Sequence, residues 1–198
     1  MLIQIKRADA IAQYKSLPHR SLRPYFFFFP KTYRVDTFTL SSRSARGHAT
    51  LLANALTSFA KLMQSDELLF LGCGTTPWLY QEAKHKAAIR AVCFLTDNKI
   101  NKRFNGAIVL KLPEQKEFIK HLFWLTRCHG SFPEVYFMDK QQQFVGNICR
   151  YGNIHLYLTE KTQEEQYLKA AAAAGFEFLE TFPCTERFGS NSARQLVV

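Results

Sequence analysis

The stretch LLFLGCGTTPWLYQEA, residues 68–83, predicts a buried strand that runs into a glycine turn and then into a helix. Its opening apolar run predicts a strand over residues 67–72. Pro77 suits the first turn of a helix, which we expect over residues 77–87. A strand, a glycine turn and a helix N-terminus together can point backbone N–H groups at an anion.

The turn itself, GCGTT, is the first candidate binding site. Glycines on both sides of the cysteine permit positive φ angles and the close approach of a ligand, and threonine hydroxyls can bond phosphate oxygens. The residues that we expect to hold phosphate, or a nucleotide cofactor such as ATP, are Gly72, Cys73, Gly74, Thr75 and Thr76. An equally simple interpretation is a strand-to-helix corner that binds nothing.

Outward from this stretch, apolar periodicity and turn residues predict further strands and helices. Before it we expect strand 2–6, helix 8–15, strand 25–29 and helix 44–63 with Ser44 as its N-cap. After it we expect strands 89–96 and 106–112, helix 113–128, strands 133–138, 143–148 and 153–158, helix 162–174 ending at Gly175, and strands 176–182 and about 193–198. Because this order contains both crossovers and hairpins, we predict an α/β (α+β-like) fold, a single domain over residues 1–198 with a mixed sheet flanked by helices.

Charge is unevenly distributed along the chain. The formal net charge is +10, and residues 1–50 carry nine basic and two acidic residues, or 9 − 2 = +7 of that total. The basic, aromatic-rich segment at residues 1–44 indicates a nucleic-acid partner, DNA favoured over RNA, because phosphate contacts release counterions. The side chains that we expect to contact nucleic acid are Arg20, Arg23, Arg34, Arg43 and Arg46. A membrane surface, or a solvated face without a partner, are the alternatives.

The run YFFFF at residues 25–29 is interleaved with these basic residues. Such a run could stack on unpaired bases, although core packing explains most of its phenylalanines more simply. A second basic group, Arg43, Arg46 and His48, lies at or near the start of helix 44–63. Cations there oppose the helix dipole unless an anion is bound. Since the glycine turn has no charge of its own, we expect Arg43, Arg46 or His48 to supply it. Three exposed residues on a frayed first turn are an equally consistent interpretation.

Composition indicates in which cellular compartment the protein is found and whether it binds zinc. No segment reaches the ~18 apolar residues of a membrane span, and the start of the chain lacks the apolar core of a signal peptide, so we expect a cytoplasmic protein. The five cysteines contain no C-x-x-C pair, which argues against zinc and predicts reduced thiols. Cys73, Cys93 and Cys149 lie in apolar runs and are expected in the core.

Two known families share features of the glycine turn. The sequence LFLGCGTT resembles the first motif of S-adenosylmethionine-dependent methyltransferases, with Asp97 as the acid that ends the next strand. Only about 100 residues follow Asp97, and their pattern is a strand meander rather than repeated strand–helix units. A small methyltransferase that uses S-adenosylmethionine is therefore the alternative function.

Residues 70–94, FLGCGTTPWLYQEAKHKAAIRAVCF, resemble the phosphate-binding segment of the ParB/sulfiredoxin superfamily. Phe70, Gly72 and Cys73 match the sulfiredoxin form of the turn, whereas Gly74 stands where sulfiredoxins begin a His-Arg pair. The resemblance implies a bacterial DNA- or nucleotide-binding protein, an ATP-hydrolysing nuclease in its enzymatic form. It also implies a role in plasmid fertility inhibition, with a nucleoprotein transfer machine as partner. A non-enzymatic basic module that inhibits by occupancy is a third possibility.

A nuclease needs a positioned base or a divalent metal held by carboxylates. Asp97 and Asp139 both follow apolar segments, and with His48 they are the candidate catalytic residues. The metal itself cannot be named from this pattern. Turn formation is the simpler interpretation of both acids, because each precedes a polar turn residue.

Overall fold

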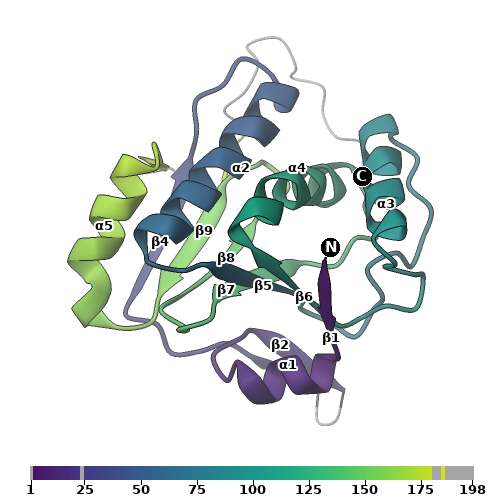
Figure 1. Cartoon of the computed structure of the whole chain (residues 1–198), viewed down its shortest axis with the longest axis horizontal. Helices are drawn as coiled ribbons and strands as arrows, with labels where there is room; N and C mark the ends of the chain where they lie inside the picture. Colours follow the sequence, from purple (N-terminus) through teal and green to yellow (C-terminus); the bar gives the residue numbers. More distant parts are fainter. Residues whose placement is uncertain (1, 23–24, 180–183, 186–198) are drawn as a thin grey trace.

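Eight strands form one sheet in the computed structural model, in the order β1-β6-β5-β7-β8-β9-β4-β10 (Figure 1). The structure describes residues 2–22, 25–179 and 184–185. The strands are β1 (Ile3–Ile5), β4 (Arg34–Thr39), β5 (Glu67–Gly72), β6 (Ala107–Lys111), β7 (Val135–Asp139), β8 (Phe144–Ile148), β9 (Ile154–Leu158) and β10 (Glu177–Phe178). Every ladder between the described strands is antiparallel.

Both faces of the sheet are covered. The helices are α1 (Arg7–Gln13), α2 (Ala45–Leu62), α3 (Lys86–Asp97), α4 (Leu112–Cys128) and α5 (Glu164–Ala173), the last preceded by the short 3-10 helix η1 (Lys161–Gln163). Helices α2 to α5 pack on one face, and α1 packs on the other together with a separate pair of strands, β2 (His19–Leu22) and β3 (Tyr25–Phe28).

Alternation along the central strands builds two cores. In β5, Leu68 and Phe70 belong to the core beneath α2 to α5, whereas Leu69 and Leu71 belong to the smaller core beneath α1. Because successive strand residues point to opposite faces, a strand covered on both sides must be apolar at almost every position. This explains why β5, β6 and β7 have near-continuous apolar sequences.

The predicted sheet flanked by helices is confirmed, but the predicted mixture of parallel and antiparallel strands is wrong for the described strands. Strand β5 has an antiparallel neighbour on each side, β6 and β7. A doubly wound methyltransferase core would instead place parallel strands there.

The predicted helix 77–87 and strand 89–96 are also wrong. After the glycine turn the chain is irregular, and α3 begins only at Lys86, with the His85 side chain accepting from the backbone N–H of Ala87. Trp78 determines this path, because its backbone N–H donates to Phe104 O (2.9 Å) and its buried indole N–H donates to Gly106 O (3.1 Å). The segment resembling the ParB/sulfiredoxin family therefore lacks the helix and following strand that the resemblance implied.

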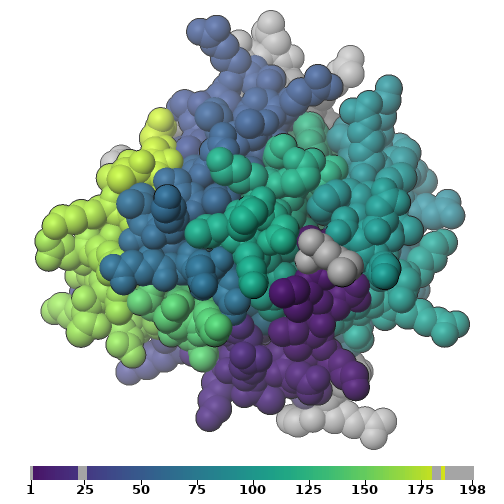
Figure 2. Space-filling model, in the orientation of Figure 1, coloured from purple at the N-terminus to yellow at the C-terminus, as the bar shows by residue number. Residues whose placement is uncertain are grey.

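The basic N-terminal segment is built into the fold. Strand β1 pairs with β6, and β4 lies between β9 and β10, so both are strands of the main sheet. Figure 2 shows the N-terminal residues, in purple, packed against the body of the molecule. The C-terminal strand expected at about 193–198 lies outside the described residues, as do residues 180–182 of the expected strand 176–182, whose described part contains β10. No helix in the described part of the chain is long and apolar enough to cross a membrane.

Candidate functional site

A pocket of about 410 Å³ lies where the β2–β3 pair meets the glycine turn. This volume is within the range of ~300–1,000 Å³ that is usual for small-ligand sites. Its lining residues come from the two segments in which the sequence indicated binding, and they are Arg20, Ser21, Phe26, Phe27, Gly74, Thr75 and Thr76. The structure thus joins the predicted turn to one of the predicted arginines.

Hydrogen bonds fix the position of the turn. Arg7 donates from Nη1 to Gly72 O (2.7 Å) and from Nη2 to Cys73 O (2.8 Å), and the backbone N–H of Cys73 donates to Glu134 O (2.7 Å). The backbone N–H of Arg20 also donates to Cys73 O (2.8 Å). The last bond ties β2 to the turn and holds Arg20 at the edge of the pocket.

The far side of the turn retains free donors. Among the described residues, the backbone N–H groups and hydroxyls of Gly74, Thr75 and Thr76 have no hydrogen-bond partner. Thr75 is held instead through its carbonyl oxygen, which accepts from Asn105 Nδ2 at 3.2 Å. Three N–H groups and two hydroxyls beside one arginine can together bind an anion.

Aromatic rings form the other wall. The side chains of Phe26 and Phe27 are 55% and 42% exposed, unusually open for phenylalanine. The guanidinium carbon of Arg20 lies 5.9 Å from the centre of the Phe27 ring. The Phe27 ring also contacts Tyr136, with 6.4 Å between the ring centres. Phe29 is less exposed and packs against Tyr136 and Tyr157 over the smaller core. The expectation that the aromatic run is mainly core therefore holds for only part of it.

The turn differs from the predicted cradle in three ways. Positive φ among the described glycines occurs at Gly152 and Gly175, so neither glycine of the turn uses it. No helix starts at Pro77, so no helix dipole points at the turn. The thiol of Cys73 is buried in the smaller core, and burial raises its pKa, so the group is a protonated core residue. Gly72 has a packing role, since a Cβ there would lie 3.3 Å from Pro133.

The second basic group does not join the pocket. Arg43 and Arg46 are exposed beside the N-terminus of α2 and line a different, shallower hollow of about 700 Å³. Ser44 is the N-cap, as predicted, and its side chain accepts from the backbone N–H of Gly47 (3.1 Å). The charge beside the glycine turn is therefore Arg20, not Arg43 or Arg46.

His48, a candidate catalytic residue, is fully buried in α2. Its Nε2 donates to Gly152 O (2.9 Å), which leaves Nδ1 to accept from the Ser42 hydroxyl (3.2 Å). With both ring nitrogens bonded inside the core, His48 connects α2 to the β8–β9 turn and has no path to a substrate.

Arg34 and Arg23 complete the predicted nucleic-acid set. Arg34 forms ion pairs with Asp36 (2.6 Å) and Glu164 (2.9 Å), and its pKa is raised, first by its hydrogen bond to Asp36. Its charge is therefore already neutralised. Arg23 lies outside the described residues.

The two candidate carboxylates are on unrelated elements. Asp97 is exposed at the end of α3, where a strand end was expected. Asp139 is fully buried at the end of β7, and its Oδ1 accepts from the backbone N–H of Phe144 (3.0 Å) across the β7–β8 turn. Burial raises the pKa of Asp139 to about 6. The turn-forming interpretation fits Asp139, and neither acid belongs to a metal-ligand cluster among the described residues.

Comparison with known proteins identifies no relative: no family model, no curated protein and no solved structure matches this chain.

Proposed function

We propose that this protein binds single-stranded nucleic acid, DNA in preference to RNA, through the pocket between the β2–β3 pair and the glycine turn. The observation that carries the proposal is the meeting of two exposed phenylalanines, Phe26 and Phe27, with Arg20 and the free donors of Thr75 and Thr76.

The aromatic wall favours unpaired bases. A base inside a duplex is already stacked on its neighbours, whereas an unpaired base can stack on an exposed ring, with a gain of roughly 1–3 kcal/mol per base. Phe27 offers such a ring beside Arg20, and Phe26 is a second exposed ring in the lining of the same pocket. Phe26 is the more exposed of the two, so more of its ring surface is open for stacking.

The turn suits the phosphate that follows a stacked base. Two of its carbonyl oxygens, those of Gly72 and Cys73, already bond to Arg7, so their partial negative charges are compensated and repel a phosphate less. The free N–H and hydroxyl groups of Gly74, Thr75 and Thr76 can then donate to phosphate oxygens, with Arg20 supplying the formal charge. The net charge of +10 adds long-range attraction for a polyanion.

Binding, rather than cleavage, is the activity that these residues support. A phosphodiesterase would need a clustered set of acids for a divalent metal or an accessible base, whereas Asp139 and His48 are buried. Binding and hydrolysis of ATP, kinship with the ParB/sulfiredoxin superfamily, and action on a nucleoprotein transfer machine in plasmid fertility inhibition stay predictions from the resemblance. The methyltransferase alternative is disfavoured by the antiparallel neighbours of β5.

Fluorescence anisotropy with a panel of ligands tests the proposal. We expect labelled single-stranded DNA to bind at least tenfold more tightly than a duplex of the same length, with single-stranded RNA between them. Unlabelled ATP and S-adenosylmethionine should not displace the strand at concentrations near its Kd. A preference for duplex, or tight binding of S-adenosylmethionine, would contradict the proposal.

A further inference from the structure

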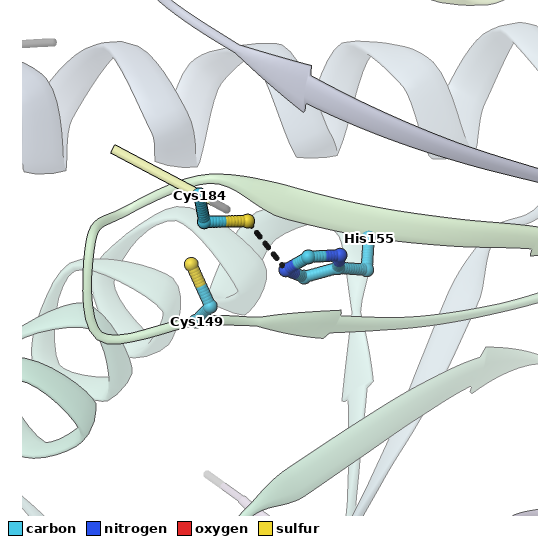
Figure 3. Close-up of side chains that lie close together, drawn as sticks. All are labelled: Cys149, His155 and Cys184. Carbon is cyan, nitrogen blue, oxygen red and sulfur yellow. Dashed lines mark hydrogen bonds between the residues drawn. The ribbon is translucent and has the colours of Figure 1, made fainter. Parts of the chain in front are cut away.

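Three side chains that are far apart in sequence meet at one end of the sheet, on the side of β9. Cys149 follows β8, His155 lies in β9, and Cys184 belongs to the segment after β10 (Figure 3). Their sulfur and imidazole nitrogen atoms all lie within 4.8 Å of one another, and each residue is half-buried. The sequence contains no C-x-x-C pair and therefore indicated no zinc site. These three residues are separated by six and then 29 positions, a spacing that could not be recognised as a metal motif.

We propose that Cys149, His155 and Cys184 bind a zinc ion, with the fourth coordination position left to water or to another ligand. Two thiolates and one neutral imidazole are a ligand set that zinc prefers, and two thiolate charges balance Zn²⁺. With Zn–S near 2.3 Å and Zn–N near 2.0 Å, tetrahedral coordination separates sulfur from nitrogen by roughly 3.6 Å. The observed distance between Cys184 Sγ and His155 Nε2 is 3.5 Å.

The His155 ring is oriented by a hydrogen bond at the nitrogen that faces away from the cysteines. Its Nδ1 is 3.1 Å from Thr37 Oγ1, on the residue directly opposite in β4. If Nδ1 donates to that hydroxyl, Nε2 carries the lone pair that points at Cys184, which is the usual arrangement of a metal-binding histidine.

The β8–β9 turn orients Cys149. Gly152, with φ +83°, closes the turn, its backbone N–H donates to Cys149 O (2.9 Å), and His48 bonds its carbonyl oxygen. The backbone N–H of Cys149 donates to Asn153 O (3.0 Å), so the turn is held from both of its sides.

Cys184 is brought to the site by a buried amide. Asn153, fully buried, donates from Nδ2 to the carbonyl oxygen of Thr185 (3.1 Å) and so anchors the residue next to Cys184. All three ligands are thus positioned by specific contacts from β4, the β8–β9 turn and the chain beyond β10. A disulfide between the two cysteines would not use the histidine, so a metal accounts for more of the arrangement.

Metal binding by the full chain tests this proposal. The reduced, chelator-treated protein should take up one zinc, and Co²⁺ should give the thiolate charge-transfer and d–d bands of a tetrahedral site. Cys149→Ser, Cys184→Ser and His155→Gln should each lose affinity by at least about 100-fold. Cys93→Ser is the matched control, because Cys93 is exposed on α3 and should bind zinc as the wild type does.

A positioning variant separates a metal site from a redox pair. Thr37→Val keeps all three ligands and should weaken zinc by roughly 10–100-fold, whereas formation of a Cys149–Cys184 disulfide should be unaffected. Circular dichroism of each metal-free variant establishes that it is folded. Equal zinc affinity in wild type and the ligand variants, or disulfide formation with no metal uptake by the reduced wild type, would overturn the proposal.

Discussion

Arg20 and Phe27 are directly opposed in the β2–β3 ladder, and the guanidinium carbon lies 5.9 Å from the centre of the phenyl ring. Directly paired residues of an antiparallel ladder project from the same face. A cation and an open aromatic surface are therefore adjacent before any ligand arrives, and the bond from the Arg20 backbone to Cys73 O fixes both beside the glycine turn.

Removing the charge of Arg20 should weaken the binding of single-stranded nucleic acid more than removing the charge of another arginine does. Arg20→Ala is expected to reduce single-strand affinity by at least tenfold and to lower the magnitude of the log–log salt slope by about 0.7, the value for one phosphate contact on a single strand. Arg34→Ala is the control: Arg34 is paired with Asp36 and Glu164, so its loss should lower stability but leave affinity and salt slope unchanged. Equal losses of affinity in both variants would mean that only net charge matters.

Gly74 allows the turn to be tested without unfolding it. A Cβ there would meet nothing closer than the backbone nitrogen of Thr76 at 3.9 Å, and its φ is not positive. Gly74→Ala should therefore leave Tm unchanged or slightly higher. The added methyl group stands where a phosphate would approach the Gly74 N–H, so single-strand affinity should fall several-fold. Unchanged affinity alongside unchanged Tm would show that the turn is only a corner.

Asp139 should give stability a distinctive pH dependence. Its pKa is raised by burial to about 6 in the folded protein, so between about pH 4 and pH 6 the native state holds more protons than the unfolded state. The free energy of unfolding contributed by this group is highest at low pH and falls as pH rises through that window. Asp139→Asn removes the titration. The stability of the variant relative to wild type should rise by up to about 3 kcal/mol from pH 4 to pH 7, measured by urea unfolding. A relative stability that is flat with pH would contradict this.

Gly152 and Gly175 share a φ of +83° but differ in their surroundings. A Cβ on Gly152 would lie 2.7 Å from His48 Nε2, whereas a Cβ on Gly175 meets nothing within 4 Å. Gly175→Ala should cost about 1 kcal/mol for the backbone conformation alone. Gly152→Ala should cost at least about 3 kcal/mol, because it adds overpacking and displaces the His48 bond. Similar costs at both positions would rule out His48 as a structural tie to this turn.

The sequence predicts those elements whose pattern is dictated by burial. The strand over 67–72 matches β5, and helix 113–128 matches α4 to within one residue, since continuous or periodic apolar residues leave few alternatives. Gly175 lies just beyond the end of α5, as predicted, whereas residues 162–163 belong to the 3-10 helix η1 rather than to α5. The region after Pro77 was mispredicted because the bonds of Trp78 to residues 104 and 106 are long-range and leave no local signal.

Long-range contacts without a local sequence signal also determine both sites. The glycine turn and Arg20 are each recognisable as candidates in the sequence, but their meeting depends on where the β2–β3 pair packs against the sheet. The Cys149, His155 and Cys184 group depends on a strand pairing and on the buried amide of Asn153, neither of which is apparent in residue spacing. Residue types can therefore be assigned from sequence, whereas the grouping of distant residues cannot.

The most direct test of the proposed function is the affinity of the Phe26→Ala, Phe27→Ala double variant for single-stranded DNA. Stacking predicts a loss of at least tenfold for the single strand, with an unchanged salt slope and little change in the weak binding of duplex, because charge is untouched. Phe178→Ala, which removes a similarly exposed ring from β10, should bind as the wild type does. Wild-type affinity in the double variant, or an equal loss for duplex and single strand, would contradict a stacking site at this pocket.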